Sequence, residues 1–245
     1  MTDTVFITGG TSGIGAGLAR AFHARGAKVI IGGRNHSALE VLAQQFTGME
    51  TQLIDVCDPE SVLACARSLE SRHPNLNVLI NNAGIQRLLD FSSGTVSAEQ
   101  IDVEIDTNFK GSIHVISAFL PILRRQALAR LVNVTSGLGF VPLVKAPIYS
   151  ATKAAQHAFT VALREQLRGS SVRVIELIPP VVETNLHRRQ PVKPPRAMPL
   201  EAFVIEAMRA LESGREELPI GLARVLRFGA RLAPNRFLRI VNRRT

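Results

Sequence analysis

Short runs of aliphatic residues, many of them β-branched, recur along the chain and are separated by longer segments of mixed polarity. The runs cover residues 4–8, 28–32, 51–55, 77–81, 130–136 and 172–178. We expect them to be buried strands, because continuous apolar runs are typical of parallel strands covered on both faces. Segments 15–26 and 37–46 space their apolar residues as helices do and end at glycine or polar turn residues.

Strands and helices therefore alternate along the chain, and this order has a topological consequence. Right-handed crossovers place helices on both faces of a parallel sheet, so we predict an α/β fold with a single doubly wound Rossmann domain. The domain spans residues 1–220 and holds a mainly parallel sheet of about seven strands. Ligands of such sheets bind beyond the carboxyl ends of the strands, so motifs at those positions carry the functional argument.

The composition is that of one globular domain. The chain has 245 residues, of which 46% are hydrophobic and 20% charged. Cys57 and Cys65 form no CxxC motif and have no histidine cluster nearby, so we expect neither a disulfide framework nor a metal site. The N-terminal residues lack a signal-peptide pattern, and no apolar segment is long enough to span a bilayer, which predicts a cytoplasmic protein.

Most of the formal net charge of +9 comes from a basic C-terminal extension, residues 221–245, which contains seven arginines and no acidic residue. It predicts an amphipathic helix with one apolar and one basic face. The apolar face carries Leu222, Val225, Leu226, Gly229 and Leu232, and the basic face carries Arg224, Arg227 and Arg231.

Packing of this apolar face on the domain or on a partner subunit is the favoured interpretation. Attachment to an anionic membrane surface is the alternative, because a basic face beside an apolar face suits such a surface. Nucleic-acid binding is disfavoured, since the extension has just two aromatic residues, Phe228 and Phe237, and no known reader motif.

A glycine-rich loop follows the first predicted strand and precedes the first predicted helix. It reads TGGTSGIG over residues 8–15 and contains Gly9, Gly13 and Gly15. Glycines here let the backbone approach a pyrophosphate at the helix N-terminus, while Thr11 and Ser12 offer hydroxyl donors. A tight strand-to-helix turn without a ligand is the alternative interpretation.

The second predicted strand ends without a carboxylate, which bears on the cofactor. An acidic side chain at this point would bind the ribose 2′-hydroxyl of NAD and repel a 2′-phosphate. The chain has Gly33 and Arg34 instead, and Arg34 offers a fork of donors to a phosphate, assisted by Asn35. We therefore expect NADP(H) rather than NAD(H). The alternative is a solvated surface arginine.

The only tyrosine of the chain, Tyr149, lies four residues before Lys153 in the sequence IYSATKAA. On a helix this spacing places both side chains on one face, so they can act as a unit. The alternative is a phenol buried for packing, which needs a hydrogen-bond partner.

Several motifs occur together in a fixed order. They are TGGTSGIG, LIDVCD (53–58), NNAG (81–84), Asn108 in DTNFKG, Ser136, YSATK (149–153) and IPPVVET (178–184). With this set the chain resembles the short-chain dehydrogenase/reductase family over residues 4–190. Within that family it is similar to a bacterial oxidoreductase subgroup, some of whose members are named for lipoteichoic-acid D-alanylation operons.

The resemblance implies an oxidoreductase that interconverts a carbonyl compound and a secondary alcohol by hydride transfer. Lys153 would hold the nicotinamide ribose and lower the pKa of Tyr149, which exchanges a proton with the substrate oxygen. Ser136 would fix that oxygen, and Asn108 would support a water chain that reprotonates the lysine. A fall of about 3 units in the pKa of the tyrosine requires roughly 4 kcal/mol, which one ammonium at about 4 Å supplies.

The resemblance also assigns binding residues. Those for the cofactor are Gly9, Thr11, Ser12, Gly13, Ile14, Gly15, Arg34, Asn35, Asp55, Val56, Asn82, Ala83, Gly84, Tyr149, Lys153, Pro179, Val182 and Thr184. Those for the substrate are Ser136, Leu138 and Tyr149, beside a mostly apolar segment that suits an apolar ketone, aldehyde or secondary alcohol. Residues 186–215 are expected to form a substrate loop or lid.

One departure from the family pattern concerns the loop beside the nicotinamide. The usual Pro-Gly is Pro179-Pro180 here. Because proline fixes φ and removes a donor, this loop is expected to differ from the usual one.

The resemblance also implies a homodimer or homotetramer, formed through the helices near residues 100–125 and 149–168. The competing interpretation is a non-catalytic NADP(H)-binding sensor or membrane-associated scaffold. It is disfavoured because a sensor has no need for Asn108, Ser136, Tyr149 and Lys153 together.

Overall fold

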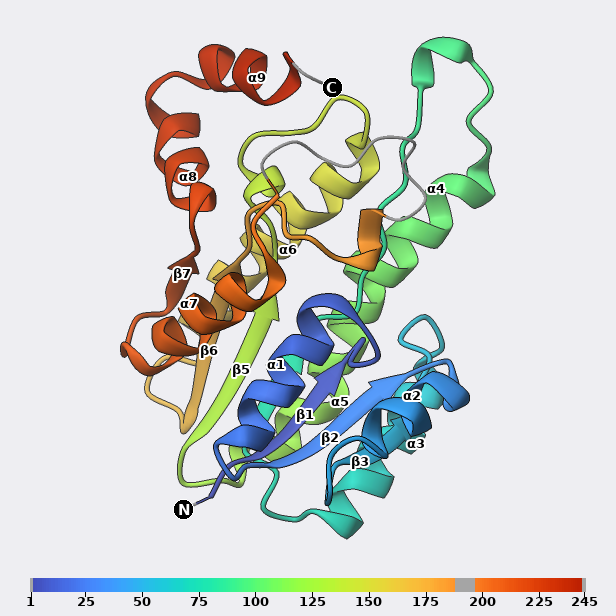
Figure 1. Cartoon of the computed structure of the whole chain (residues 1–245), viewed down its shortest axis with the longest axis vertical. Coiled ribbons are helices and arrows are strands. Elements are labelled where there is room, and N and C mark those ends of the chain that lie inside the picture. The colour runs from blue at the N-terminus through green and yellow to red at the C-terminus, as the bar shows by residue number, and fades with distance from the viewer. Residues whose placement is uncertain (1, 188–196, 244–245) are drawn as a thin grey trace.

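The computed structural model describes residues 2–187 and 197–243. Its centre is a parallel sheet with the strand order β3-β2-β1-β4-β5-β6-β7, covered by helices on both faces (Figure 1). The strands are β1 (Thr4–Thr8), β2 (Lys28–Gly33), β3 (Glu50–Leu53), β4 (Val78–Asn81), β5 (Ala129–Val134), β6 (Val172–Ile178) and β7 (Glu217–Pro219). The predicted doubly wound α/β fold is confirmed.

Helices follow most of the strands. They are α1 (Gly13–Ala24), α2 (His36–Ala43), α3 (Pro59–Arg72), α4 (Ala98–Ile105), α5 (Gly111–Arg124), α6 (Pro147–Gln166), α7 (Leu200–Glu212), α8 (Leu222–Leu232) and α9 (Pro234–Asn242). Shorter helical turns are η1 (Phe91–Ser93), η2 (Asp106–Lys110), η3 (Gly137–Gly139) and η4 (Asn185–His187). The turn η2 is π-helical and joins α4 to α5 without a break.

Two apolar layers enclose the sheet, because successive residues of a strand point to opposite faces. On β1, Val5 and Ile7 belong to the layer shared with α1, α2 and α7. Phe6 belongs to the layer shared with α3, α5 and α6, where its ring stacks on Phe119 with 5.0 Å between the ring centroids. Burial on both faces explains why the strands read as continuous apolar runs.

The direction of winding reverses at β1, which lies between β2 and β4 in the sheet. Crossovers therefore leave β1 and its neighbours toward both edges of the sheet. The loops after β1 and β4 diverge at the carboxyl ends of these strands, which is where doubly wound folds bind their ligands.

The sheet departs from the sequence pattern most clearly at its two edge strands, for physical reasons. The sequence pattern missed β7 because it is very short and has just one buried side chain, Leu218. The run 51–55 forms a strand that ends at Leu53, and its side chains are half-buried or exposed because β3 is an edge strand.

Part of the segment predicted as a lid is helical. Residues 188–196 lie outside the described residues, and residues 200–212 form α7, which packs on α1. The packing is close, because a Cβ added to Gly17 of α1 would lie 2.7 Å from Cγ2 of Val204. This makes α7 part of the helical layer over β1.

The C-terminal extension forms α8 and α9, which fold back over one end of the domain (Figure 1). Ala223 and Leu226 of α8 approach Gly137 of η3. The predicted apolar face is only partly used, since Val225 and Leu232 are exposed along with Leu222. Within the described ranges, none of the helices has both the length and the apolar character that a bilayer crossing requires.

Gly229 of α8 receives the ring of Phe237 from α9, and a Cβ at this glycine would lie 2.2 Å from Cζ of the ring. We expect Gly229→Ala to displace the ring and to lower the free energy of unfolding by about 1–3 kcal/mol, as overpacking does. Urea denaturation measures the change. With Phe237→Ala already present, Gly229→Ala should be neutral or stabilising by up to about 1 kcal/mol. If Gly229→Ala lowered the free energy of unfolding equally in the wild type and in Phe237→Ala, the contact between the two residues would be contradicted.

Candidate active site

The glycine-rich loop turns sharply between β1 and α1. Gly9 and Gly13 have φ angles of +65° and +54°, which favour glycine because other residues rarely adopt them. Gly15 has no room for a side chain, since a Cβ there would lie 2.3 Å from the carbonyl oxygen of Gly9. Ser12 makes no side-chain bond to the start of α1. Its hydroxyl and the first amides of the helix can therefore bind an anion such as a pyrophosphate.

Asn82, directly after β4, fastens this loop to the neighbouring strand. Its side-chain amide donates to the carbonyl oxygens of Thr8 and Gly9 at 3.0 and 3.2 Å. In return, the Thr8 hydroxyl accepts the backbone amides of Asn82 and Ala83 at 3.0 and 3.1 Å. The sequence reasoning missed Thr8, and its position at the last residue of the strand before the loop was the available signal.

The segment after β6 closes the other side of the loop. A Cβ at Gly13 would lie 3.1 Å from Cβ of Thr184, and Val182 nearby is buried. The carbonyl oxygen of Pro179 accepts the amide of Gly137 at 2.9 Å. The segment that carries the two prolines is thus attached both to the glycine loop and to η3.

Arg34 and Asp55 lie together where β2 and β3 end. Nη1 of the arginine is 3.9 Å from Oδ2 of Asp55, and the arginine side chain is 64% exposed. Asn35 accepts the amide of Ala38 at 3.0 Å and so caps α2, while Asp55 accepts the amide of Cys57 at 3.0 Å. Arg34 is therefore the member of this group whose charged end is available to an anionic ligand.

The other predicted cofactor residues of the loops lie along the same edge. Thr11 lies against the end of β2, since a Cβ at Gly33 would be 3.3 Å from its Cγ2. Ile14 and Val56 pack against the two apolar layers, one on each side of the sheet. Their side chains therefore stabilise the loops from which backbone groups face the crevice.

The four predicted catalytic residues meet at the carboxyl edge of the sheet. Tyr149 and Lys153 occupy one face of α6, with the ammonium 5.9 Å from the centroid of the phenol ring. Ser136 lies just beyond β5, and Asn108 lies in η2. Gly84 lies between two of them, because a Cβ there would be 3.2 Å from Oδ1 of Asn108 and 3.8 Å from Nζ of Lys153.

The ammonium of Lys153 is buried and hydrogen-bonded. It donates to the carbonyl oxygen of Val134 at 2.8 Å and to Oε1 of Gln156 at 2.9 Å. Burial lowers the pKa of Lys153 to about 8, and the buried carboxylate of Glu176 opposes that shift. Gln156 was missed by the sequence reasoning, although its position three residues after Lys153 on a helix is the spacing of a contact.

The phenol of Tyr149 differs from the sequence expectation. Burial raises its pKa to about 12, the side-chain hydrogen bond with Ser136 lowers it, and the carboxylate of Glu104 raises it further. The expected lowering assumed an ammonium at about 4 Å. In the structure Lys153 Nζ is 5.9 Å from the ring centroid and directs its hydrogen bonds elsewhere. Burial therefore dominates, and the phenol is protonated at neutral pH.

A π-helical turn holds Asn108 at the site. Its Oδ1 accepts the amide of Ile85 at 2.8 Å, and its amide nitrogen donates to the carbonyl oxygen of Ile85 at 2.9 Å. The same nitrogen donates to the hydroxyl of Thr152 at 3.3 Å. Asn108 thus joins the loop after β4 to α6, and π-helical turns are frequent at functional sites.

Glu104 is a buried carboxyl that the sequence reasoning missed. It lies on α4 shortly before Asn108 and has no exposed surface. Its Oε1 accepts the amide of Arg87 at 3.2 Å, whereas Oε2 has no hydrogen-bond partner among the described residues. Burial raises the pKa of Glu104 to about 7 against the opposing effect of Arg87. Its role had no signal in the sequence, because Asp102 and Asp106 flank it and look equivalent.

Leu138 and Tyr149, both predicted to contact the substrate, belong to a small apolar cluster that also contains Ala146. Val241 of α9 packs against this cluster. The C-terminal extension therefore borders the predicted substrate site, which the sequence pattern did not indicate.

Asn242 ties α9 to the predicted substrate segment. Its Oδ1 accepts the amide of Val144 at 2.7 Å, and its amide nitrogen donates to the carbonyl oxygen of Pro142 at 3.1 Å. These two bonds hold the loop between η3 and α6 against the end of the chain.

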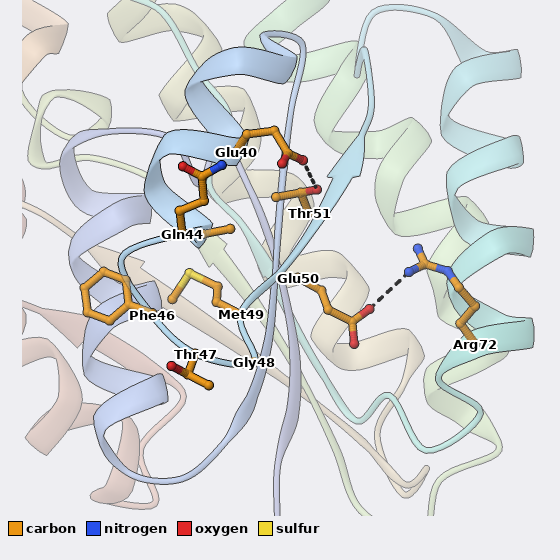
Figure 2. A pocket seen from close by; sticks show the side chains of 10 residues that line it. Glu40, Gln44, Phe46, Thr47, Gly48, Met49, Glu50, Thr51 and Arg72 are labelled. Carbon is orange, nitrogen blue, oxygen red and sulfur yellow. Dashed lines mark hydrogen bonds and ion pairs between the residues drawn. The ribbon is translucent and has the colours of Figure 1, made fainter.

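A separate hollow, shown in Figure 2, lies at the start of β3 and away from the predicted site. Four of its polar side chains are engaged in pairs: Glu50 pairs with Arg72 at 3.1 Å, and Thr51 donates to Glu40 at 3.2 Å. No predicted site residue lines it. Elsewhere in the described part of the chain, no group of three or more His, Cys, Asp or Glu side chains is arranged to hold a metal ion.

Comparisons with known proteins show which proteins this chain resembles in sequence and in fold. The model of the short chain dehydrogenase family matches residues 3–194. The uncharacterised oxidoreductase DltE of Bacillus subtilis (strain 168) is 42% identical over 219 residues, which cover 88% of this chain and 87% of that protein.

Solved structures extend the similarity to the whole fold. A short chain dehydrogenase from Burkholderia cenocepacia J2315 in complex with NADP has a TM-score of 0.84 and 29% identity, and the match covers 98% of this chain and 96% of that one. The 3-ketoacyl-(acyl-carrier-protein) reductase from Brucella melitensis complexed with NADH has a TM-score of 0.78 and 26% identity, covering 88% and 95%. Relatives thus bind either dinucleotide.

The raised pKa of Glu104 predicts a pH-dependent stability. Its folded pKa of about 7 exceeds the ordinary value of 4.5, so the stability it contributes is complete below pH 4.5 and is lost as the pH rises through 7. The loss amounts to about 3 kcal/mol at most. We expect Glu104→Gln to reduce the difference in unfolding free energy between pH 5 and pH 8, measured with urea.

Asp102→Asn is the matched control, because Asp102 is exposed on the same helix. It should retain the pH difference of the wild type. A Glu104→Gln variant that also retained it would show that this carboxyl is ionised in the folded protein at both pH values.

Proposed function

This chain belongs to the short-chain dehydrogenase family of oxidoreductases, and from that membership we propose that it reduces a carbonyl compound to a secondary alcohol with NADPH, or runs the reverse reaction with NADP⁺. The observation that carries the proposal is that Tyr149 and Lys153 share one face of α6, with Ser136 beside the tyrosine, while Asn108 and Lys153 both approach Gly84. If each of these residues had only its own packing role, there would be no reason for the four of them to lie together.

The residues of the carboxyl edge fit a dinucleotide. The loop with Gly9, Gly13 and Gly15 leaves its backbone open to a pyrophosphate, and Arg34 lies where an adenosine 2′-phosphate would lie in such folds. Lys153 and Thr184 would hold the nicotinamide end. When bound, the nicotinamide supplies the hydride that is exchanged with the carbonyl carbon.

Tyr149 is the proposed acid. Its phenol is protonated at neutral pH, because burial raises its pKa to about 12, so it is in the state that donates a proton to a carbonyl oxygen. Ser136 would hold that oxygen through its hydroxyl. The ammonium of Lys153, 5.9 Å from the centroid of the ring, stabilises the resulting tyrosinate by Coulomb attraction. Lys153 thus offsets part of the cost that burial imposes on the charged phenolate.

Asn108 and Lys153 are the proposed return path for the proton. Both lie within contact distance of the position above Gly84, and the pKa of Lys153, lowered to about 8 by burial, lets it give up a proton more readily than an exposed lysine. The carbonyl compound is proposed to be apolar, because Leu138, Ala146 and Val241 surround the tyrosine. Assembly into a homodimer or homotetramer and a cytoplasmic location stay predictions.

Tyr149→Phe tests the acid. The variant should lose turnover of any carbonyl substrate by about 10²–10⁴-fold, the usual contribution of a general acid. NADPH binding, measured by the fluorescence of the nicotinamide, should stay near the wild-type value because the ring is retained. Glu165→Gln, at the far end of the same helix, is the control and should keep full turnover. Retained activity in Tyr149→Phe would refute the mechanism.

Arg34→Asp tests the cofactor preference. The substitution removes the donors for a 2′-phosphate and adds a carboxylate that suits a 2′-hydroxyl. We expect the ratio of kcat/KM for NADPH to that for NADH to fall by about 10²-fold or more, as two to three kcal/mol of charged hydrogen bonding is lost. Arg168→Ala, an exposed arginine after α6, should leave the ratio unchanged. A wild-type protein that prefers NADH would contradict the assignment directly.

A further inference from the structure

Large apolar side chains stand exposed along one stripe of α8. They are Leu222, Val225, Phe228 and Leu232, spaced three or four residues apart as on one helical face. Phe228 is 64% exposed and Leu232 is 85% exposed. Other positions of the helix are buried: Ala223 lies beside Gly137 of η3, and Gly229 lies against the ring of Phe237 from α9. Within the described residues, the stripe is therefore an unpartnered face of the helix.

The surroundings of this stripe are strongly basic. Residues 218–245 contain no aspartate or glutamate. Arg224 and Arg227 are paired within the protein, with Glu206 at 3.2 Å and Glu217 at 2.5 Å. Arg231, Arg236 and Arg239 form no ion pair with any residue in the described ranges. Their charges are thus directed at solvent or at a partner.

The two helices hold a fixed arrangement. The ring of Phe237 fills the space above Gly229, and Asn242 is hydrogen-bonded to the loop at Val144 and Pro142. Figure 1 shows α8 and α9 together at one end of the molecule. The apolar stripe and the unpaired arginines are therefore carried by one preformed pair of helices.

We propose that α8 and α9 bind peripherally to the surface of an anionic lipid membrane. An interfacial helix buries aliphatic and aromatic side chains at the level of the acyl chains while its arginines bind the phosphates of the headgroups. Leu222, Phe228 and Leu232 are the apolar side chains that would be buried, and the unpaired arginines are the groups that would bind the phosphates. The negative surface potential of anionic lipids attracts such clustered positive charge, and each basic residue strengthens the attraction.

A second copy of the chain fits the same surface less well. A twofold contact places the same patch on both subunits, so the unpaired arginines of one copy would face those of the other with no carboxylate from residues 218–245 to neutralise them. A soluble polyanion would match the positive charge but would leave the apolar stripe in water. An anionic lipid surface both neutralises the arginines and buries the apolar stripe.

Cosedimentation of the full-length protein with vesicles tests the proposal. One set of vesicles is phosphatidylcholine alone, and the other contains phosphatidylglycerol as well. We expect the partition coefficient to be at least about tenfold higher on the anionic vesicles and to fall as salt is added, because each headgroup contact by an arginine contributes roughly fivefold.

Paired variants separate the two contributions. Phe228→Ser/Leu232→Ser should lower the partition coefficient on anionic vesicles by about tenfold or more, whereas Val41→Ser/Leu63→Ser, which removes exposed apolar side chains from α2 and α3, should not. Arg236→Glu/Arg239→Glu should abolish binding. Arg67→Glu/Arg168→Glu changes the net charge equally at other surfaces and should have a small effect.

The proposal would be overturned by no binding to anionic vesicles, by equal binding to both kinds of vesicle, or by equal loss of binding in the test and control pairs. Light scattering measures the oligomeric state and so tests whether the stripe binds a second copy of the chain. If Phe228→Ser/Leu232→Ser converted an oligomer to a monomer without changing vesicle binding, the stripe would be a subunit interface and the proposal would be wrong. NADPH binding by each variant verifies that it is folded.

Discussion

The rest of the site depends on the hydrogen bonds of the buried ammonium of Lys153. A buried charge is tolerated only when its hydrogen bonds are satisfied. Here the acceptors are the carbonyl oxygen of Val134 and the side chain of Gln156. Gln156 in turn donates to Ser112 of α5, which also accepts the side-chain amide of Asn81 at the end of β4. One lysine is therefore connected through polar contacts to two strands and two helices, so the geometry of the site is set by the core.

That connection explains how residues far apart in the sequence act together. Asn82 fastens the glycine loop to β4, Asn108 fastens the loop after β4 to α6, and Pro179 fastens the segment after β6 to η3. The contacts of Asn82 and Pro179 join the carboxyl ends of neighbouring strands, and the contact of Asn108 joins a strand end to a helix. The crevice is consequently bordered by short rigid loops, and chemical variety within such a fold can arise at Leu138 and Val241 without changing these bonds.

Much of the fold was predictable from the sequence, because burial on both faces leaves a strong local signal. β1 and β6 coincide with their apolar runs, whereas β7 has one buried residue and left no such signal. The site was predictable where the chemistry depends on short spacings, as for Tyr149 and Lys153. It was not predictable where tertiary burial decides, as for Glu104, which resembles its acidic neighbours until the fold removes it from water. The pKa of Tyr149 differed from expectation for the same reason.

The π-helical turn η2 constrains the length of the chain as well as its composition. A π turn holds one more residue than an α turn and absorbs it locally, so the helices on either side keep their faces. Loss of one residue between 106 and 110 would restore a regular turn and would change the direction in which the side chain of Asn108 points. The bonds that join Ile85 to Asn108 and Asn108 to Thr152 would then be lost, even though the flanking helices were unchanged. In this part of the molecule a gap of one residue is therefore a more severe change than most substitutions.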